Sequence, residues 1–193
     1  MARVHILGGS GSGTSTLGAA LAGELGVPHF DTDDFFWLPT VPRFREKRPM
    51  PERLSLLSAA LDATAAWTLS GSLSGWGDPL LSRFTLVVYL EVPRHVRLAR
   101  LREREARRYG IEAISPGGDL HAAHVSFLDW ATSYDEPEFS GRSRAKHERW
   151  ITSLGCDVLR VDATAPARAV LREVLEHLQS APGFTRGDRG AET

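Results

Sequence analysis

The sequence predicts an α/β fold in which helices cover both faces of a five-stranded parallel sheet, giving three layers. Two observations support this prediction. Short apolar runs alternate with longer helical patterns along the chain, which is the order of βαβ units with right-handed crossovers. The clearest run, residues 84–92, is almost continuously apolar, as expected of a parallel strand buried on both faces.

The first half of the chain is expected to hold three of the strands. Its first run is rich in β-branched residues and ends at Gly8, which favours a strand followed by a glycine loop. The next segment places Leu17, Leu21 and Leu25 on one helical face, with a glycine just past its end. In order, the expected elements are a strand at 3–7, a helix at 16–25, a strand at 27–30, a loop at 38–51, a helix at 53–66 and a strand at 67–70.

The second half begins with the buried strand, which Pro93 ends. Pro166 suits the first turn of the last helix. Residues 182–193 are small and polar, and we expect a flexible tail there, after a single domain that spans 1–181. The expected elements are a strand at 84–92, a helix at 94–108, a loop at 115–118, helices at 120–134 and 142–154, a strand at 157–161 and a helix at 166–180.

Composition argues against several classes of protein. The 193-residue chain has 23 Lys and Arg against 24 Asp and Glu, and this net charge of −1 argues against nucleic-acid or membrane binding through bulk positive charge. No stretch approaches the ~20 apolar residues of a membrane span, and the first residues lack a secretion-signal pattern. The single cysteine, Cys156, fits a reducing cytoplasm. We therefore expect a cytoplasmic monomer or homodimer without nucleic-acid or membrane partners.

The most informative segment is a run of glycine, serine and threonine between the first strand and the first helix. Glycines let the backbone take positive φ and approach an anion, while the helix N-terminus adds partial positive charge. The spacing matches the phosphate-binding pattern G-x-x-x-x-G-K-[ST] except that Thr14 stands in place of the lysine. The residues expected to contact nucleotide are Gly8, Gly9, Ser10, Gly11, Ser12, Gly13, Thr14, Ser15 and Thr16.

Thr14 brings a hydroxyl group but no charge, so three interpretations are open. An arginine elsewhere supplies the missing charge, or the loop binds nucleotide without catalysis, or the loop is only a structural turn. In the first two, the hydroxyl of Ser15 would ligate Mg²⁺ held by the nucleotide phosphates. A helix-capping role for Ser15 is compatible with this.

At this point the sequence resembles the P-loop kinases of small molecules, the adenylate-kinase-like group that includes nucleoside monophosphate, shikimate and gluconate kinases and topology-modulation proteins. The resemblance covers residues 3–177. The features that carry it are the glycine loop, the acidic cluster after the second strand, the Gly71-Ser72 turn after the third and the arginine-rich helix after Pro93. It implies a P-loop NTPase fold with a helical lid at about 107–146, and ATP and Mg²⁺ as cofactors.

The acidic cluster follows the second strand, at the sheet edge where α/β proteins bind ligands. The resemblance places Asp31 near the water shell of Mg²⁺ and Asp33 near the acceptor, where a carboxylate can orient a hydroxyl or take its proton. Asp34 is a further acceptor-binding candidate, or pairs with an arginine of the 43–48 segment. The alternative for the whole cluster is a helix cap with solvated charges.

Other candidates for binding the acceptor are aromatic residues and a glycine-rich turn. Trp37 and Trp76 would form part of the wall of an acceptor pocket, or else pack in the core. Gly71 and Ser72 follow a strand and are expected to contact the acceptor, as the resemblance implies.

The helix at 94–108 carries seven arginines, five of which share one broad face. By resemblance, Arg100 lies near the nucleotide base and Arg104 reaches the phosphates; the alternative is a solvated face. Arg142 and Arg144, from the expected lid, are candidates to replace the lysine.

Together with Asp33, the arginines Arg104, Arg142 and Arg144 form the expected catalytic set. The function this implies is transfer of the γ-phosphoryl group of ATP to a nucleoside monophosphate or a hydroxylated metabolite. The alternative is a catalytically weak nucleotide-binding regulator.

Overall fold

The computed structural model describes residues 1–41 and 43–180, so the expected tail at 182–193 lies outside the described residues. A five-stranded sheet forms the centre of the molecule, with strand order β2-β3-β1-β4-β5 and every neighbouring pair parallel. This confirms the predicted three-layer α/β class. The strands are β1 (Arg3–Gly8), β2 (His29–Asp31), β3 (Trp67–Ser70), β4 (Leu86–Glu91) and β5 (Asp157–Asp162).

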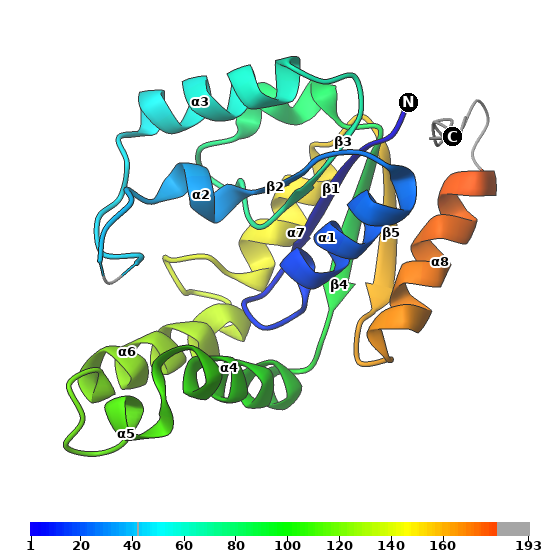
Figure 1. Ribbon diagram of the computed structural model, residues 1–193. Helices are drawn as coiled ribbons and strands as arrows, with labels where there is room; N and C mark the ends of the chain where they lie inside the picture. Colours follow the sequence, from blue (N-terminus) through cyan, green and yellow to red (C-terminus); the bar gives the residue numbers. More distant parts are fainter. Residues whose placement is uncertain (42, 181–193) are drawn as a thin grey trace, which may run out of the picture.

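Helices occupy the segments between the strands (Figure 1), and each of the six predicted helices is present. The second of them, expected at 53–66, begins earlier, at Met50, because Pro51 is accommodated in its first turn, where its missing N–H costs nothing. The helices are α1 (Thr14–Leu25), α2 (Thr32–Phe36), α3 (Met50–Asp62), α4 (Arg94–Tyr109), α5 (Ile111–Ile114), α6 (His121–Thr132), α7 (Arg144–Thr152) and α8 (Ala167–Ser180), with 3-10 turns η1 (Asp78–Arg83) and η2 (Ser133–Asp135).

Alternation along the central strands divides the core into two layers. In β4, Leu86 and Val88 belong to the cluster formed with α1 and α8, whereas Val87 and Tyr89 belong to the cluster formed with α3 and α7. This is the pattern of a strand whose successive side chains point to opposite faces, both of them covered.

The helices α4, α5 and α6 lie together at one end of the molecule, apart from the sheet (Figure 1). Leu98 and Leu101 of α4 form a small apolar cluster with Ala131 of α6, against which Phe127 and Trp130 pack. This helical unit includes much of the segment for which the resemblance implied a lid.

Strand register brings the chemistry-bearing turns to one edge of the sheet. Asp31, the last residue of β2, pairs with Ser70 at the end of β3, and Ser70 also pairs with Ile6 of β1. Because the three strands are parallel, the glycine loop, the acidic cluster and the Gly71-Ser72 turn all emerge at this edge. Among the described residues, no helix has the length and apolar character needed to cross a membrane.

Candidate functional site

The glycine loop connects β1 directly to the first turn of α1. Gly11 and Gly13 have φ of +85° and +100°, which side chains disfavour. Gly8 lies so close to Ser12 that no side chain would fit there, whereas the space around Gly13 is open. The loop thus has the form of an anion cradle that leads into a helix N-terminus, and it fits a nucleotide phosphate.

Two side chains, Arg97 of α4 and Tyr134 of η2, support this loop from behind. Arg97 Nη1 donates a hydrogen bond of 3.2 Å to the carbonyl of Ser10. A Cβ atom on Gly9 would lie 3.1 Å from the same nitrogen and 2.9 Å from the Tyr134 ring. The Arg97 guanidinium also lies over the Tyr134 ring and pairs with Asp135. A cationic group, with 1% of its surface exposed, is therefore packed under the loop.

Sequence reasoning placed Arg97 on the arginine face but not in the site. The available signal was its spacing from Leu101, one helical turn further on, which puts it on the apolar side of α4. An arginine in an apolar stripe is expected to be paired when buried.

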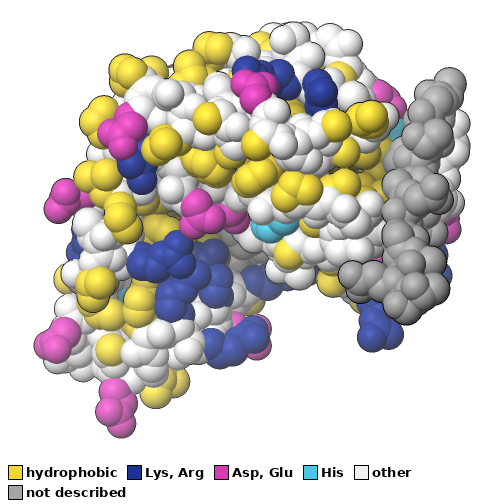
Figure 2. All heavy atoms as spheres, turned by 45° about the horizontal axis from the view of Figure 1, so that its top comes forward, with side chains coloured by type: hydrophobic (Ala, Val, Ile, Leu, Met, Phe, Trp, Pro, Cys, Tyr) yellow, Lys and Arg dark blue, Asp and Glu magenta, His cyan; other side chains and the backbone are white. Residues whose placement is uncertain are grey.

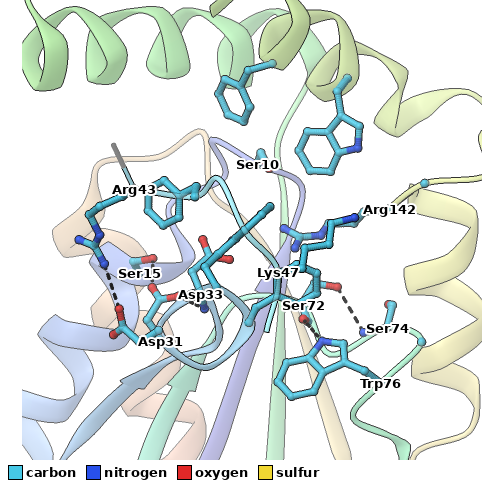
Figure 3. Close-up of a pocket in the computed structure, with 18 of the residues that line it drawn as sticks. Ser10, Ser15, Asp31, Asp33, Arg43, Lys47, Ser72, Ser74, Trp76 and Arg142 are labelled. Carbon is cyan, nitrogen blue, oxygen red and sulfur yellow. Dashed lines mark hydrogen bonds and ion pairs between the residues drawn. The ribbon is translucent and has the colours of Figure 1, made fainter. Parts of the chain in front are cut away.

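Ser15 and Asp31, the two expected magnesium ligands, point at each other (Figure 3). Ser15 Oγ donates a hydrogen bond of 2.5 Å to Asp31 Oδ2, to which Ser70 Oγ also donates at 3.0 Å. The backbone N–H of Asp33 donates to Asp31 Oδ1 at 3.0 Å, so Asp31 also caps α2. A hydroxyl and a carboxylate are oxygen donors of the kind that Mg²⁺ prefers, so this pair fits the ion.

A cavity of about 1590 Å³ opens beside the loop and the acidic cluster. It is lined by Ser15, Asp31, Asp33 and Asp34. Figure 2 shows Lys and Arg side chains gathered in the hollow. Its cations are Arg43, Arg45, Lys47, Arg104, Arg108, Arg142, Lys146 and Arg149. Its aromatic residues are Phe36, Trp37, Phe44, Trp76, Tyr109, Phe127, Trp130 and Trp150.

Asp33 and Arg142 both point into this cavity (Figure 3). Burial raises the pKa of the Asp33 carboxyl above its usual value, and the neighbouring Asp31 adds to the effect, while the charges of Arg142 and Arg104 oppose it. The Arg142 guanidinium lies 5.6 Å from the centre of the Trp130 ring. The site thus combines a carboxylate that is a better base than usual with an arginine nearby.

The other two catalytic candidates lie differently. Arg104 is on the cavity wall, above the Phe127 ring at 5.6 Å. Arg144 is not among the residues that line the cavity. Its Nε and Nη2 donate to Asp135 Oδ1 at 3.1 and 2.9 Å, which places its guanidinium next to Arg97 and behind the loop.

Arg100 lines a second cavity, of about 320 Å³, on the other side of the loop. Its Nη2 donates to the carbonyl of Ala163 at 2.9 Å, and Ser12, Gly13 and Thr16 share the same wall. The structure thus brings Arg100 to the loop, but separates it from the large cavity that holds Asp33.

The turn after β3 forms another wall of the large cavity. Gly71 has φ of +104°, and a side chain there would overlap Thr32. Trp76 Nε1 donates to the carbonyl of Ser72 at 3.2 Å, so Trp76 belongs both to the core and to the cavity wall. Asp34 is exposed and pairs with Arg43 at 3.1 Å, as one of the two alternatives anticipated.

Comparison with known proteins identifies the family. A search of protein-family models finds no match. The chain is 46% identical over 177 residues to the uncharacterized protein YqaC of Bacillus subtilis (strain 168). The aligned region covers 92% of this chain and 97% of YqaC.

Solved structures show the fold. A sugar kinase from Janibacter sp. HTCC2649 has a TM-score of 0.53 and 19% identity, covering 94% of this chain and 96% of that one. A shikimate kinase from Bacteroides thetaiotaomicron has a TM-score of 0.51 and 19% identity, covering 92% and 98%. The chain therefore has the fold of P-loop small-molecule kinases and belongs to the same family as YqaC.

Proposed function

We propose that this protein transfers the γ-phosphoryl group of ATP to a small molecule, either a nucleoside monophosphate or a hydroxylated metabolite. The observation that carries the proposal is the position of Asp33, a carboxylate of raised pKa in the cavity that also contains the loop residues Ser10 and Ser15. A base and a phosphate cradle in one cavity are what phosphoryl transfer to a hydroxyl requires.

On the donor side, the backbone N–H groups of the glycine loop and the N-terminus of α1 would hold the phosphates of ATP. The second cavity, beside Arg100, is where the base of the nucleotide would lie. Ser15 and Asp31 would hold Mg²⁺, and Ser70 fixes the orientation of Asp31. When bound, Mg²⁺ supplies charge neutralisation on the phosphate oxygens.

On the acceptor side, Asp33 would orient the acceptor hydroxyl and accept its proton. The acceptor oxygen then forms a bond to the γ-phosphorus while the bond from that phosphorus to the bridging oxygen breaks, and ADP leaves. Asp34, Trp37, Ser72 and Trp76 are the side chains that would contact the acceptor, because they share the cavity with Asp33. Gly71 supplies the positive φ of the turn that places Ser72 at the cavity.

Thr14 contributes no charge, so other cations would stabilise the transferring group. Arg142 and Arg104 line the same cavity as Asp33, and their charges oppose the rise in the pKa of that carboxyl. Arg144 and Arg97 would act from behind the loop, through its backbone. Guanidinium groups are suited to charge spread over phosphate oxygens.

A panel of acceptors tests the proposal. The protein is incubated with ATP and Mg²⁺ and with AMP, CMP, gluconate or shikimate in turn, and ADP is followed by ³¹P NMR. We expect ADP only when a suitable acceptor is present, and a loss of at least roughly 100-fold in Asp33→Asn. Asp62→Asn is the matched control, because that carboxylate is exposed, pairs with Arg83 and does not line the cavity.

The same experiment separates the alternative, a nucleotide-binding regulator without turnover, which the uncharged Thr14 favours. Tight ATP binding in calorimetry with no ADP formed would establish the regulator. Absence of heat with every purine or pyrimidine triphosphate at millimolar concentration would refute both.

A further inference from the structure

Four buried side chains form a hydrogen-bonded chain that ends at the cavity wall. The hydroxyl oxygens of Tyr89 and Tyr134 are 3.0 Å apart, Tyr134 lies 3.0 Å from His147 Nδ1, and His147 Nε2 lies 2.9 Å from Ser72 Oγ. The residues come from β4, η2, α7 and the turn after β3. Each has 4% of its surface or less exposed, yet Ser72 lines the cavity.

The imidazole in this chain is neutral. Burial lowers the pKa of His147 to about 3, and the charges of Arg142 and Arg144 act in the same direction. A neutral imidazole has one nitrogen that donates a hydrogen bond and one that accepts. The hydrogen bonds in this series of side chains must therefore all point the same way. Which way they point follows from finding an acceptor for each proton.

Tyr89 fixes that direction. Within residues 1–41 and 43–180, the only hydrogen-bond partner of its hydroxyl is Tyr134, so Tyr89 must donate to Tyr134 to avoid a buried proton without an acceptor. Tyr134 then donates to His147 Nδ1, and His147 donates from Nε2 to Ser72 Oγ. The reverse direction would leave the Tyr89 proton buried and unpaired.

Ser72 Oγ is consequently saturated as an acceptor. It accepts from His147 Nε2 and, at 3.3 Å, from the backbone N–H of Ser74 (Figure 3). A hydroxyl has two acceptor lone pairs and one proton. Across the described part of the chain, Ser72 Oγ has no other hydrogen-bond partner, so its proton is free to point into the cavity.

We propose that Ser72 is a specificity-determining residue that donates a hydrogen bond to the acceptor molecule, and that His147 and Tyr134 are positioning residues that keep it a donor. This deepens the proposed function and rests on it. The acceptor class it implies carries a proton-free oxygen, such as a carbonyl, carboxylate or phosphate oxygen, in addition to the hydroxyl that Asp33 would hold. An acceptor that presents only an N–H group at this position would oppose the Ser72 proton and bind less well.

The first test needs no substrate and so is independent of the proposed function. The protein is labelled with ¹⁵N-histidine, and long-range ¹H–¹⁵N spectra at pH 7 report which ring nitrogen of His147 carries the proton. The signal is assigned by its loss in His147→Gln. We expect protonated Nε2 and unprotonated Nδ1; protonated Nδ1 overturns the proposal.

Two tyrosine variants provide a matched pair. Tyr134→Phe removes the donor to His147, and we expect the tautomer preference to weaken. Tyr89→Phe leaves that donor in place, so the tautomer is expected to stay as in the wild type. A tautomer change in Tyr89→Phe would show that the hydrogen bonds point in the reverse direction, and would overturn the proposal.

The second test measures acceptor specificity in Ser72→Ala. With whichever of AMP, CMP, gluconate and shikimate turns over fastest, loss of one neutral hydrogen bond should raise the KM for the acceptor roughly 3- to 10-fold, with kcat and the KM for ATP little changed. An unchanged acceptor KM overturns the role of Ser72, even if the tautomer is as expected. Absence of turnover in the wild-type protein refutes the proposed function instead, and the tautomer still reports on the chain itself.

Discussion

Arg97 donates a hydrogen bond to the carbonyl of Ser10, so a buried cation lies directly behind the glycine loop. Asp135 pairs with Arg97, Arg144 and Arg94, and Arg94 also pairs with Glu136, which leaves three positive charges against two negative in this cluster. In an environment of low dielectric, the surplus charge acts over a longer range than it would in water. Behind a loop that lacks the usual lysine, it favours a bound polyanion.

Arg97→Met should therefore affect nucleotide binding and stability together. We expect the affinity for ATP to fall roughly tenfold or more, about 1.4 kcal/mol, because the charge behind the loop is lost. Breaking a buried ion pair should also lower the free energy of unfolding by roughly 3 kcal/mol. Calorimetry with ATP and urea denaturation measure the two effects. Arg94→Met, a half-exposed neighbour that also pairs with Asp135, is the control and should leave ATP affinity unchanged.

Thr14→Lys tests whether other cations replace the lysine. Because Arg142 and Arg104 already line the cavity, we expect kcat to change by less than about tenfold, or 1.4 kcal/mol of barrier. The measurement is the steady-state rate of ADP formation at saturating acceptor. A gain far above that would mean that the arginines contribute little of the missing charge.

The pH dependence of turnover should report on Asp33. Burial raises the pKa of this carboxyl, and a general base must be deprotonated to act. The acid limb of the kcat/KM profile is therefore expected above pH 4, the ordinary range of an aspartate being near 3.9. Asp62→Asn, outside the cavity, should leave the limb in place. A flat profile down to pH 4 would remove Asp33 from the role of base.

Stability should fall on mild acidification because two histidines are buried in neutral form. Burial lowers the pKa of His147 to about 3 and that of His5 to about 4, whereas an imidazole in the unfolded chain has a pKa near 6.5. Between these values the unfolded chain binds more protons, so the free energy of unfolding decreases as the pH drops below 6.5.

From pH 7 to pH 5 each imidazole should cost about 2 kcal/mol, measured by urea denaturation. His147→Gln should flatten the dependence by that amount, whereas the exposed His95→Gln should not. An equal slope in the wild type and His147→Gln would contradict a neutral buried His147.

Gly71→Ala should destabilise the fold strongly. Gly71 has positive φ and its missing side chain is replaced in space by Thr32, so a methyl group meets both backbone strain and a clash. We expect a loss of more than about 2 kcal/mol in the free energy of unfolding. Gly75→Ala is the matched control, because Gly75 also has positive φ but faces open space; its loss should stay near 1 kcal/mol. Equal losses would mean that the contact with Thr32 carries no cost.

The sequence predicted the sheet well because each strand is a local pattern. The five runs of apolar and β-branched residues lie between helical segments, and the parallel orientation of the strands follows from that alternation. The glycine loop and Asp31 were found for the same reason, since both adjoin strand ends. Short α2 was not among the expected helices, but a helix cap at the acidic cluster was one of the alternatives, and Asp31 does cap α2.

The buried network was beyond the reach of local patterns. Ser72 and His147 are 75 residues apart, and Arg97 lies 87 residues from Ser10. Spacing tells which residues share a helix face, but not which distant side chain a polar group will meet when the helix packs. Arg144 was singled out as a cation for the phosphates, and only the fold reveals Asp135 as its partner.

Two adjacent residues of the three-residue turn η2 contact side chains from different parts of the site. Asp135 holds Arg97 at the loop, and the adjacent Tyr134 holds His147 at the turn that carries Ser72. Two residues that are adjacent in sequence, Tyr134 and Asp135, thus support the proposed acceptor site and the proposed nucleotide site respectively. A displacement of this turn would disturb both contacts at once, so the proposed nucleotide site and the proposed acceptor site are coupled through these two residues, and redesign of either site should leave them unchanged.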